Sequence, residues 1–595
     1  MIFGLIAAAL SSIFEVVSPM LLKFGIDGMG KGNPLGWLYL ISGLIVLAAG
    51  VGGIFRYFMR MTVIGISRYV ESDIRESYFT RLLGLAPLFF DKNHTGDLMA
   101  RATEDVERVR MVLGPALLYS VSTVLTLLFS GAMMFYLDAK LTSLVFLLAP
   151  VVAVAVLSVA TSLHRANLKQ QEAYGELTSH VQENLSGIRV IKAFAREDNE
   201  LGRFTEACRL YFNRSMGVAR IQAVFMPLLG LIIGIGVIGI LWIGGKRVVT
   251  GEFTLGSFIA FMSYLGIMTW PMIALGWVTH IFQRGSASFK RLNKIYDVPL
   301  QFPEDGFLAQ EFRLAEFAGN KLGSKIPVKP VDHQAEISPE FTDLHAPSIS
   351  FRDIQFKYRD DEPFIFSDLN LNITAGSTVA VVGRTGSGKS TLVRILTRLY
   401  DPQSGLIRID GKLWTEYSVG QLRYLIGYVD QTPFMFSTTI RENITFGKKD
   451  VSDKEITAVS KAACLDKDVA DFPDGYNTVI GERGVTLSGG QQQRLTLARA
   501  LLLDPPILIL DDALSAVDTE TELEILNGIS DRLKGRTTIF ITHRLAAAEK
   551  ADRVVVIEDG KVAEEGSHAD LMKLDGIYSA MYRRQRISDE LGALK

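Results

Sequence analysis

Six long apolar segments in the first half of the chain constrain its fold more than any other feature. Each is free of charge, or nearly so, for about 20 residues or more, which is enough to cross the hydrocarbon core of a bilayer as a helix. They cover roughly residues 1–22, 35–55, 115–137, 141–163, 221–245 and 253–279. Buried helices of a soluble protein rarely supply such a succession of runs, so the sequence predicts an all-α, six-helix transmembrane domain.

Basic residues predict which side of the membrane each connection faces. Segments 56–114 and 164–220 carry nine Lys and Arg residues each, whereas the short connections 23–34, 138–140 and 246–252 carry five together. Because basic loops stay in the cytoplasm, the two long segments are expected on that side. Their apolar residues recur with helical spacing, which predicts that the membrane helices continue well beyond the bilayer as cytoplasmic extensions.

Composition excludes some classes of function. Hydrophobic residues make up 48% of the chain, which fits a membrane protein. The net charge of −2 gives no basic footprint, so no nucleic-acid partner is expected. The two cysteines, Cys208 and Cys464, lie far apart in the sequence and predict neither a disulfide framework nor a metal cluster.

The pattern changes after the last apolar segment. Residues 297–347 are rich in Pro, Gly and mixed charges without a steady period, which is typical of a linker. From Ile349 onward, short β-rich runs alternate with helical ones. The sequence therefore predicts a transmembrane domain over 1–296, a linker over 297–347, and an α/β domain with a largely parallel core sheet over 348–595.

A phosphate-binding loop stands near the start of the second domain. The stretch "GRTGSGKS" (Gly383–Ser390) follows the apolar strand "TVAVV" and opens a helical run, which is the context that this motif requires. Backbone N–H groups of such a loop and the helix N-terminus bind phosphate. Lys389 is expected to reach the outer phosphates and the Ser390 hydroxyl to bind Mg²⁺. A glycine-rich turn with an accidental lysine is the alternative, and the flanking strand and helix disfavour it.

Two more features extend this site. Asp511 ends the apolar run "ILIL" and is the natural carboxylate for the same Mg²⁺, directly or through water. The stretch "LSGGQQQR" (Leu487–Arg494) puts a second anion-binding turn at the start of another helical run. One triphosphate does not need two such turns, so the second is expected to serve a nucleotide held by another subunit.

These motifs together resemble the nucleotide-binding domain of ABC transporters, an α/β P-loop ATPase. The resemblance includes Tyr358 upstream of the phosphate loop, Gln431 in "VDQTPFMF", and "GERG" just before the "LSGGQ" signature. It also includes "SAVD" after the two aspartates and His543 in "ITHRL". With six membrane segments ahead of this domain, the chain resembles an exporter-type half-transporter, most of all bacterial multidrug-resistance-like ATP-binding/permease subunits.

The resemblance implies a set of ATP-binding residues. Tyr358 would stack on the adenine. The phosphates would be wrapped by Gly383, Arg384, Thr385, Gly386, Ser387, Gly388, Lys389, Ser390 and Thr391. Mg²⁺ would be held by Ser390, Gln431 and Asp511, and Gln431 would also link the ion to the membrane domain. Catalysis would use Asp512, His543 and Gln431, with His543 contacting the γ-phosphate and ordering the attacking water.

The resemblance also implies residues that act between subunits. The signature would close on the γ-phosphate of ATP held by the opposing subunit through Leu487, Ser488, Gly489, Gly490 and Gln491. Ser515 and Asp518 would communicate between the two sites. Short coupling helices near 102–107 and 194–199 would pass nucleotide closure to the membrane domain.

Asp512 departs from the family pattern, in which the residue after the Mg²⁺ aspartate is usually glutamate. Aspartate is one methylene shorter, so its carboxylate would sit about 1 Å back from the water, a misplacement that can cost roughly a hundredfold in rate. An intact signature beside this change predicts a heterodimer in which the other chain supplies the glutamate. A homodimer with two slow sites and an ATP-gated regulatory or channel subunit with little turnover remain as alternatives.

The sequence indicates the transported compound less clearly than it indicates the ATP site. The run 253–279 carries aromatic residues and a proline that could line a path for apolar, often cationic, compounds: Phe258, Phe261, Tyr264, Trp270, Pro271 and Trp277. Glu15, inside the first run, is expected near a wet cavity or a neighbouring helix. The expected function is ATP-driven export of amphipathic small molecules or lipids across a bacterial plasma membrane, in contact with membrane lipid.

Overall fold

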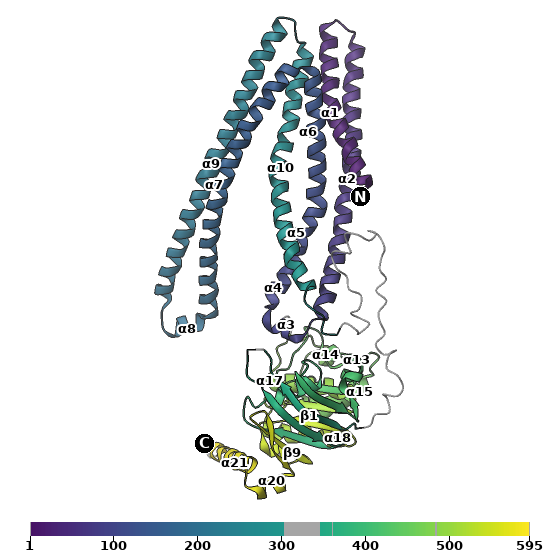
Figure 1. Ribbon diagram of the computed structural model, residues 1–595, viewed down its shortest axis with the longest axis vertical. Coiled ribbons are helices and arrows are strands. Elements are labelled where there is room, and N and C mark those ends of the chain that lie inside the picture. The colour runs from purple at the N-terminus through teal and green to yellow at the C-terminus, as the bar shows by residue number, and fades with distance from the viewer. Residues whose placement is uncertain (1, 303–345, 360, 482–484, 594–595) are drawn as a thin grey trace. The chain divides into compact units, whose positions relative to one another are not determined.

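The computed structural model describes residues 2–302, 346–359, 361–481 and 485–593 (Figure 1). These described residues fall into two compact units, one within residues 1–75 and 101–292 and the other within residues 76–100 and 293–595. Most of the predicted linker, 303–345, and residues 482–484 of the "GERG" stretch lie outside the described residues.

Helices account for the whole described chain up to residue 296, apart from short turns. They are α1 (Ile2–Gly30), α2 (Leu35–Leu83), α3 (Pro87–Lys92), α4 (Thr95–Ala100), the π-helical turn η1 (Arg101–Asp105), α5 (Val106–Met111), the π-helical turn η2 (Val112–Ala116), α6 (Leu117–Leu137), α7 (Ala139–Ser186), α8 (Ile188–Ala193), α9 (Glu197–Val249) and α10 (Leu255–Tyr296).

Length and hydropathy together mark the membrane-crossing helices. Among the described residues, four helical stretches are long and apolar enough to span a bilayer: Ile2–Gly30, Leu35–Leu83, Thr95–Leu137 and Leu255–Tyr296. The predicted spans 141–163 and 221–245 lie within α7 and α9, some of whose side chains are outside the described set. Helices α2, α7, α9 and α10 have 49, 48, 53 and 42 residues. At about 1.5 Å per residue each is roughly twice as long as the bilayer core is thick, which confirms the helical extensions.

The two segments predicted as coupling helices lie in different places relative to the turns between these helices. Helices α7 and α9 run side by side (Figure 1), and the reversal between them contains α8, so residues 194–199 begin at the C-cap of α8. After α2, the chain instead reverses through α3 and α4. Residues 102–107 therefore lie inside the helical run η1–α5, beyond that reversal, because the π-helical turn continues the helix through them.

Two of the aromatic residues predicted to line a transport path are core residues of the first unit. Phe261 and Tyr264 are fully buried, and the Tyr264 hydroxyl donates a hydrogen bond of 2.7 Å to the Val16 carbonyl of α1. Trp270 and Trp277 stay exposed on the same helix. Of the predicted set, these two tryptophans are therefore better placed for contacts outside the unit.

Buried ion pairs join helices of the first unit that are far apart in the sequence. Glu71 of α2 lies 3.5 Å from Arg110 of α5, and both side chains are less than a tenth exposed, at 7% and 6%. Asp105, also buried, pairs with Arg291 of α10 and accepts a hydrogen bond of 2.8 Å from Ser288. Opposite charges therefore compensate each other where water does not solvate them.

The strands of the second unit follow the linker. They are β1 (Ile349–Phe356), β2 (Phe366–Ile373), β3 (Thr378–Val382), β4 (Ser404–Ile409), β5 (Lys412–Leu413), β6 (Ile426–Val429), β7 (Ile507–Asp511), β8 (Thr537–Ile541), β9 (Arg553–Glu558) and β10 (Lys561–Gly566). An antiparallel sheet has the order β2-β1-β4-β5, and a larger sheet has the order β10-β9-β3-β8-β7-β6. Strands β9, β3, β8, β7 and β6 pair in parallel, as predicted.

Most helices of the second unit lie between its strands in sequence, and the last two follow β10. They are α12 (Lys389–Leu396), the 3₁₀ turn η4 (Trp414–Glu416), α13 (Val419–Tyr424), α14 (Ile440–Ile444), α15 (Asp453–Ala462), α16 (Asp466–Ala470), the 3₁₀ turn η5 (Gly475–Asn477), α17 (Gly489–Leu502), α18 (Thr519–Leu533), α19 (Leu545–Ala548), α20 (His568–Leu574) and α21 (Ile577–Ala593). One core fills the space between the two sheets and α12, and another packs α14, α15, α17 and α18 against β6 and β7.

Candidate nucleotide-binding site

The predicted site residues follow four neighbouring parallel strands. In the register of the sheet, Val381 of β3 and Asp511 of β7 both lie beside Ile541 of β8, and Val429 of β6 lies beside Leu510. Gly383 comes directly after β3, and Asp512 directly after β7. Gln431 and His543 each stand two residues beyond β6 and β8. The fold thus gathers these residues at the carboxyl edge of the sheet, where open α/β sheets bind ligands.

The phosphate loop has a backbone that only glycine allows at two positions. Gly388 has φ +99°, and a Cβ there would lie 2.7 Å from the Phe366 ring. At Gly383 a Cβ would lie 2.3 Å from the Ile557 carbonyl oxygen. Gly388 is also the N-cap of α12 and brings no side-chain cap, so the first N–H groups of this helix face the loop without a side-chain acceptor among the described residues. This arrangement suits an anion.

Lys389 is held against the loop. Its buried ammonium donates hydrogen bonds of 2.9 Å to the carbonyl oxygens of Gly383 and Arg384. Burial lowers the pKa of Lys389, and the neighbouring Asp511 and Asp512 carboxylates oppose that shift. A phosphate oxygen is a stronger acceptor than a neutral carbonyl, so the ammonium is well placed to exchange these partners for an anion.

Asp511 and Ser390 form an oxygen-lined pair. The Ser390 hydroxyl donates a hydrogen bond of 3.0 Å to Oδ1 of Asp511. Oδ2 of Asp511 is buried and has no hydrogen-bond partner among the described residues. Burial raises the pKa of Asp511 to about 6, with Asp430 and Asp512 adding to the effect while the hydrogen bond from Ser390 and the charge of Arg394 oppose it. A carboxylate with an unused oxygen beside a hydroxyl fits Mg²⁺.

A backbone hydrogen bond holds Asp512 beside the end of β8. Its N–H donates a hydrogen bond of 2.9 Å to the Ile541 carbonyl at the end of β8, and its φ is +49°. Aspartate is among the few side chains that tolerate this left-handed conformation well. The side chain is half-buried beside Asp511, so the position predicted for the catalytic base lies at the sheet edge with a short acid in it.

Tyr358 contacts α12, and Gln431 follows β6. The Tyr358 hydroxyl is 3.1 Å from Oγ1 of Thr391 in α12, and its ring meets Tyr400 edge-on at a centroid distance of 5.0 Å. Gln431 is exposed and donates its N–H to Oδ1 of Asp430 over 2.8 Å.

Tyr400 was not predicted. Its hydroxyl donates a hydrogen bond of 2.8 Å to Oδ2 of Asp91 in α3, within the second unit. The two residues stand 309 positions apart, so no local pattern announces this contact.

The signature begins a second capped helix. Ser488 is the N-cap of α17 and forms a capping box with Gln491: its Oγ accepts from the Gln491 N–H, and its own N–H donates to the Gln491 side chain over 2.9 Å. Gln491 also donates to Asp468. No hydrogen bond or ion pair within the described chain joins residues Leu487–Gln491 to the phosphate loop. Among the described residues, hydrogen bonds therefore join the phosphate-loop helix to Asp511 but do not join the signature to the phosphate loop.

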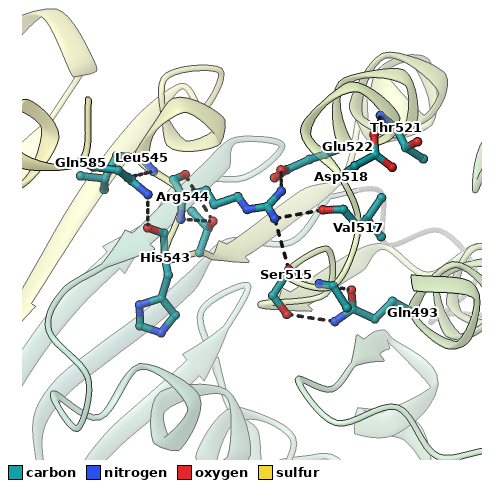
Figure 2. Close-up of polar contacts among 12 residues, drawn as sticks. Gln493, Ser515, Val517, Asp518, Thr521, Glu522, His543, Arg544, Leu545 and Gln585 are labelled. Atoms are coloured by element: carbon teal, nitrogen blue, oxygen red, sulfur yellow. Dashed lines mark hydrogen bonds and ion pairs between the residues drawn. The ribbon is translucent and has the colours of Figure 1, made fainter. Parts of the chain in front are cut away.

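The signature helix is instead fastened to the loop after the two aspartates (Figure 2). Gln493 of α17 donates to the Ser515 hydroxyl over 3.0 Å and accepts from the Ala516 N–H over 2.9 Å. Asp518 caps α18 by accepting the Thr521 N–H, and that hydrogen bond lowers the pKa of Asp518. Gln493 lies inside the quoted "LSGGQQQR" stretch, but the sequence alone gave it no role.

Two family models match this chain. The one described as the ABC transporter transmembrane region matches residues 1–272, and the one described as ABC transporter matches residues 366–515. The probable multidrug resistance ABC transporter ATP-binding/permease protein YheI of Bacillus subtilis is 36% identical over 98% of this chain and 95% of its own length.

The chain belongs to the ABC transporter family. The multidrug resistance-like ATP-binding protein MdlA of Escherichia coli is 35% identical to this transporter over 98% of the chain and 93% of its own length. An ATP-dependent lipid A-core flippase of Desulfotalea psychrophila is 33% identical over 95% of the chain and 93% of its own length.

A solved bacterial Atm1-family ABC exporter with ATP bound confirms the fold. It superposes with a TM-score of 0.75 at 27% identity and covers 98% of both chains. This transporter is therefore an exporter-type membrane protein with an ATP-binding, ATPase-coupled domain on the cytoplasmic side. The predicted fold class is confirmed: a helical transmembrane domain is fused to a C-terminal α/β ATPase domain.

Proposed function

We propose that this exporter moves amphipathic small molecules or lipids across a bacterial plasma membrane as the slower half of a heterodimer. The observation that carries the proposal is Asp512. It occupies the family's glutamate position at the end of β7, its backbone is tied to β8, and Asp511 beside it retains the features of a metal ligand. A shortened acid in an otherwise complete site reduces turnover without removing nucleotide binding.

The proposed ATP site uses the residues gathered at the sheet edge. The loop from Gly383 to Thr391 wraps the phosphates, Lys389 pairs with the outer ones, and Tyr358 stacks on the adenine. Ser390, Asp511 and Gln431 hold Mg²⁺, which when bound neutralises charge on the phosphates.

The proposed dimer explains why the signature is separate from the phosphate loop. Ser488, Gly489 and Gly490 contact the γ-phosphate on the partner chain, and His543 serves the γ-phosphate on this chain. A partner with glutamate at the position of Asp512 would form the faster site with this chain's intact signature. A homodimer with two slow sites is the alternative that the experiment below separates.

The proposed route from nucleotide to membrane starts at α3. Tyr400 contacts Tyr358 edge-on and donates its hydroxyl to Asp91, so the adenine-stacking residue is one side chain away from a helix of the 76–100 segment. The segments near 102–107 and 194–199 remain predicted contributors to coupling.

The names of the relatives support the proposed substrate class. One relative is named for multidrug resistance, another as multidrug resistance-like and another for a lipid A-core, and drugs and lipids of these kinds combine apolar and polar parts. Trp270 and Trp277, exposed on α10, offer aromatic faces to such compounds.

ATP hydrolysis by the purified chain in nanodiscs tests the proposal, with Lys389→Ala as the blank and Asp512→Glu alongside. We expect the wild type alone to match its blank, and Asp512→Glu to raise turnover by about tenfold or more because the carboxylate moves about 1 Å toward the water. Robust Lys389-dependent turnover by the wild type alone would instead establish a homodimer in which Asp512 serves as base. Uptake of a labelled amphipathic compound by inside-out vesicles separates a pump from a channel.

A further inference from the structure

Arg544, the residue after His543, contacts three separate groups. The Arg544 guanidinium forms an ion pair with Glu522 of α18, whose side chain is 6% exposed. The same group donates hydrogen bonds to two backbone carbonyl oxygens of the preceding loop, Val517 over 2.9 Å and Ser515 over 3.2 Å (Figure 2). One side chain thus holds both ends of the Ser515–Asp518 loop and the first turns of the helix that follows it.

The backbone around Arg544 is held from the other side by the C-terminal helix. Oε1 of Gln585 in α21 accepts the Leu545 N–H over 2.8 Å, and its Nε2 donates to the His543 carbonyl over 3.2 Å. Gln585 therefore bonds to the backbone of both neighbours of Arg544, as a donor to one and an acceptor for the other. The His543 imidazole projects away from these contacts (Figure 2), so its position depends on a backbone that Gln585 fixes.

We propose that Arg544 and Gln585 are positioning residues for ATP hydrolysis. Gln585 fixes the backbone from which His543 projects, and Arg544 ties that backbone to the Ser515–Asp518 loop, which Gln493 in turn ties to the signature helix. A displacement of the histidine segment is thereby transmitted to the loop that faces the other site. The inference rests on the proposed γ-phosphate contact of His543 for its catalytic consequence, but the mechanical link stands on contacts alone.

The chemistry of the two side chains makes them hard to replace. A guanidinium presents several N–H donors in a rigid fork, whereas lysine offers a compact charge that cannot bond one carboxylate and two separated carbonyls at once. Glu522 is buried, so its charge requires a cation nearby. Only an amide side chain can donate and accept as Gln585 does, and glutamate at this position would lose the donor.

The first test substitutes Gln585 and follows backbone hydrogen exchange. In Gln585→Leu we expect faster exchange in peptides covering residues 542–546, because the Leu545 N–H loses its acceptor, and also in peptides covering 512–518. Tyr582→Phe is the matched control on the same helix, since it removes a hydrogen bond of 3.3 Å to Glu549 without touching the histidine segment. Exchange confined to 542–546 would overturn the proposed transmission.

The second test asks whether Arg544 carries that transmission. In Arg544→Lys we expect faster exchange at 512–518, and adding Gln585→Leu should then cause little further increase there. Arg536→Ala is the control, because Arg536 stands at the opposite end of β8 and pairs with Asp504. Additive effects of the two substitutions at 512–518 would contradict the proposal. Arg544→Ala would leave the buried Glu522 carboxylate without this partner and could fail to fold. The test therefore relies on Arg544→Lys and Gln585→Leu, which keep a cation beside Glu522.

Turnover by the purified Asp512→Glu chain provides the catalytic readout, because in this background the site served by its own His543 carries the longer acid and no partner site contributes. Gln585→Leu and Arg544→Lys should lower kcat about tenfold with KM for ATP within about twofold and unchanged thermal melting, because misplaced groups affect the reaction more than binding. A fall that tracks loss of folded protein would reduce both residues to a structural role. Should His543→Ala leave kcat unchanged, the proposed function of His543 is wrong, whereas the exchange results still judge the link between the two segments.

Discussion

The two glycine-rich turns of the nucleotide domain each lead into a helix, but the helices begin differently. At α12 the N-cap is Gly388 in a left-handed conformation, with no side-chain cap and with the Lys389 ammonium drawn back onto the loop. At α17 the N-cap is Ser488, and a complete capping box with Gln491 already satisfies part of the helix end. At the first turn, the N–H groups at the start of α12 therefore have no side-chain cap and can bind an anion. At the second turn, the capping box stabilises the start of α17 without a ligand.

This difference suggests different roles for the two turns: the phosphate loop binds nucleotide, and the signature closes on nucleotide held by another subunit. The phosphate loop is joined to the metal-binding acid through Ser390 and Asp511, so it can hold a nucleotide with residues of its own chain. The signature is joined to the Ser515–Asp518 loop through Gln493, so its neighbours are the residues proposed to act between subunits. Substitutions at the two helix starts should therefore affect different steps.

The largest effect is expected for the first turn. Lys389→Ala should weaken ATP binding to this chain's loop by about a hundredfold or more, because the loop loses the Lys389 ammonium that is proposed to pair with the phosphates. Binding of a fluorescent ATP analogue measures this. Lys448→Ala is the control, since Lys448 also bonds a carbonyl, that of Leu502 over 3.3 Å, but away from the sheet edge. Unchanged binding in Lys389→Ala would remove the distinction between the turns.

A smaller and selective effect is expected for the second turn. Ser488→Ala should lower hydrolysis by the assembled dimer about tenfold or more while ATP binding to the chain's own loop stays within about twofold. The loss of the cap costs only about 1 kcal/mol in stability. Ser418→Ala removes the N-cap of α13, which has the same Ser–Gln capping box, and controls for that cost. Weaker ATP binding in the monomeric state would show that the signature serves its own chain.

The smallest effect concerns pH. Mg²⁺ requires the ionised Asp511 carboxylate, whose pKa is raised to about 6, chiefly by burial. Lowering the pH through 6 protonates this group, so the affinity for Mg²⁺-ATP should fall by about tenfold between pH 7 and pH 5. Because ATP also titrates in this range, the measurement is the difference between wild type and Asp511→Asn. Equal pH dependence in both proteins would show that Asp511 does not hold the ion.

Sequence reasoning found what short stretches encode. The phosphate loop, Asp511 and the signature were predictable because each motif lies within one turn and its flanking strand or helix. The six apolar segments and the alternation after Ile349 likewise predicted both parts of the fold, since hydrophobic periodicity is a local property.

Contacts between segments that are far apart in the sequence could not be predicted from local patterns. Tyr400 meets Asp91 across 309 positions, and Gln585 meets His543 across 42. Arg544 was visible in "ITHRL", but only the fold shows that it holds the loop before α18. The sequence also does not reveal that the helix continues through η1, so that residues 102–107 lie within a helical run.

The buried pair of Glu71 and Arg110 has a consequence for how this membrane domain can change over generations. Each partner has a further opposite charge beside it, because Glu71 also pairs with Arg68 over 2.8 Å and with Arg75 over 2.6 Å, and Arg110 also pairs with Glu107. Losing one member of this network therefore leaves the remaining buried charge with another partner, unlike an isolated buried pair, where such a loss costs about 3–5 kcal/mol. Single substitutions among these residues should therefore be tolerated over generations, so the net balance of charge at this junction of α2 and α5 is more constrained than any one of its positions.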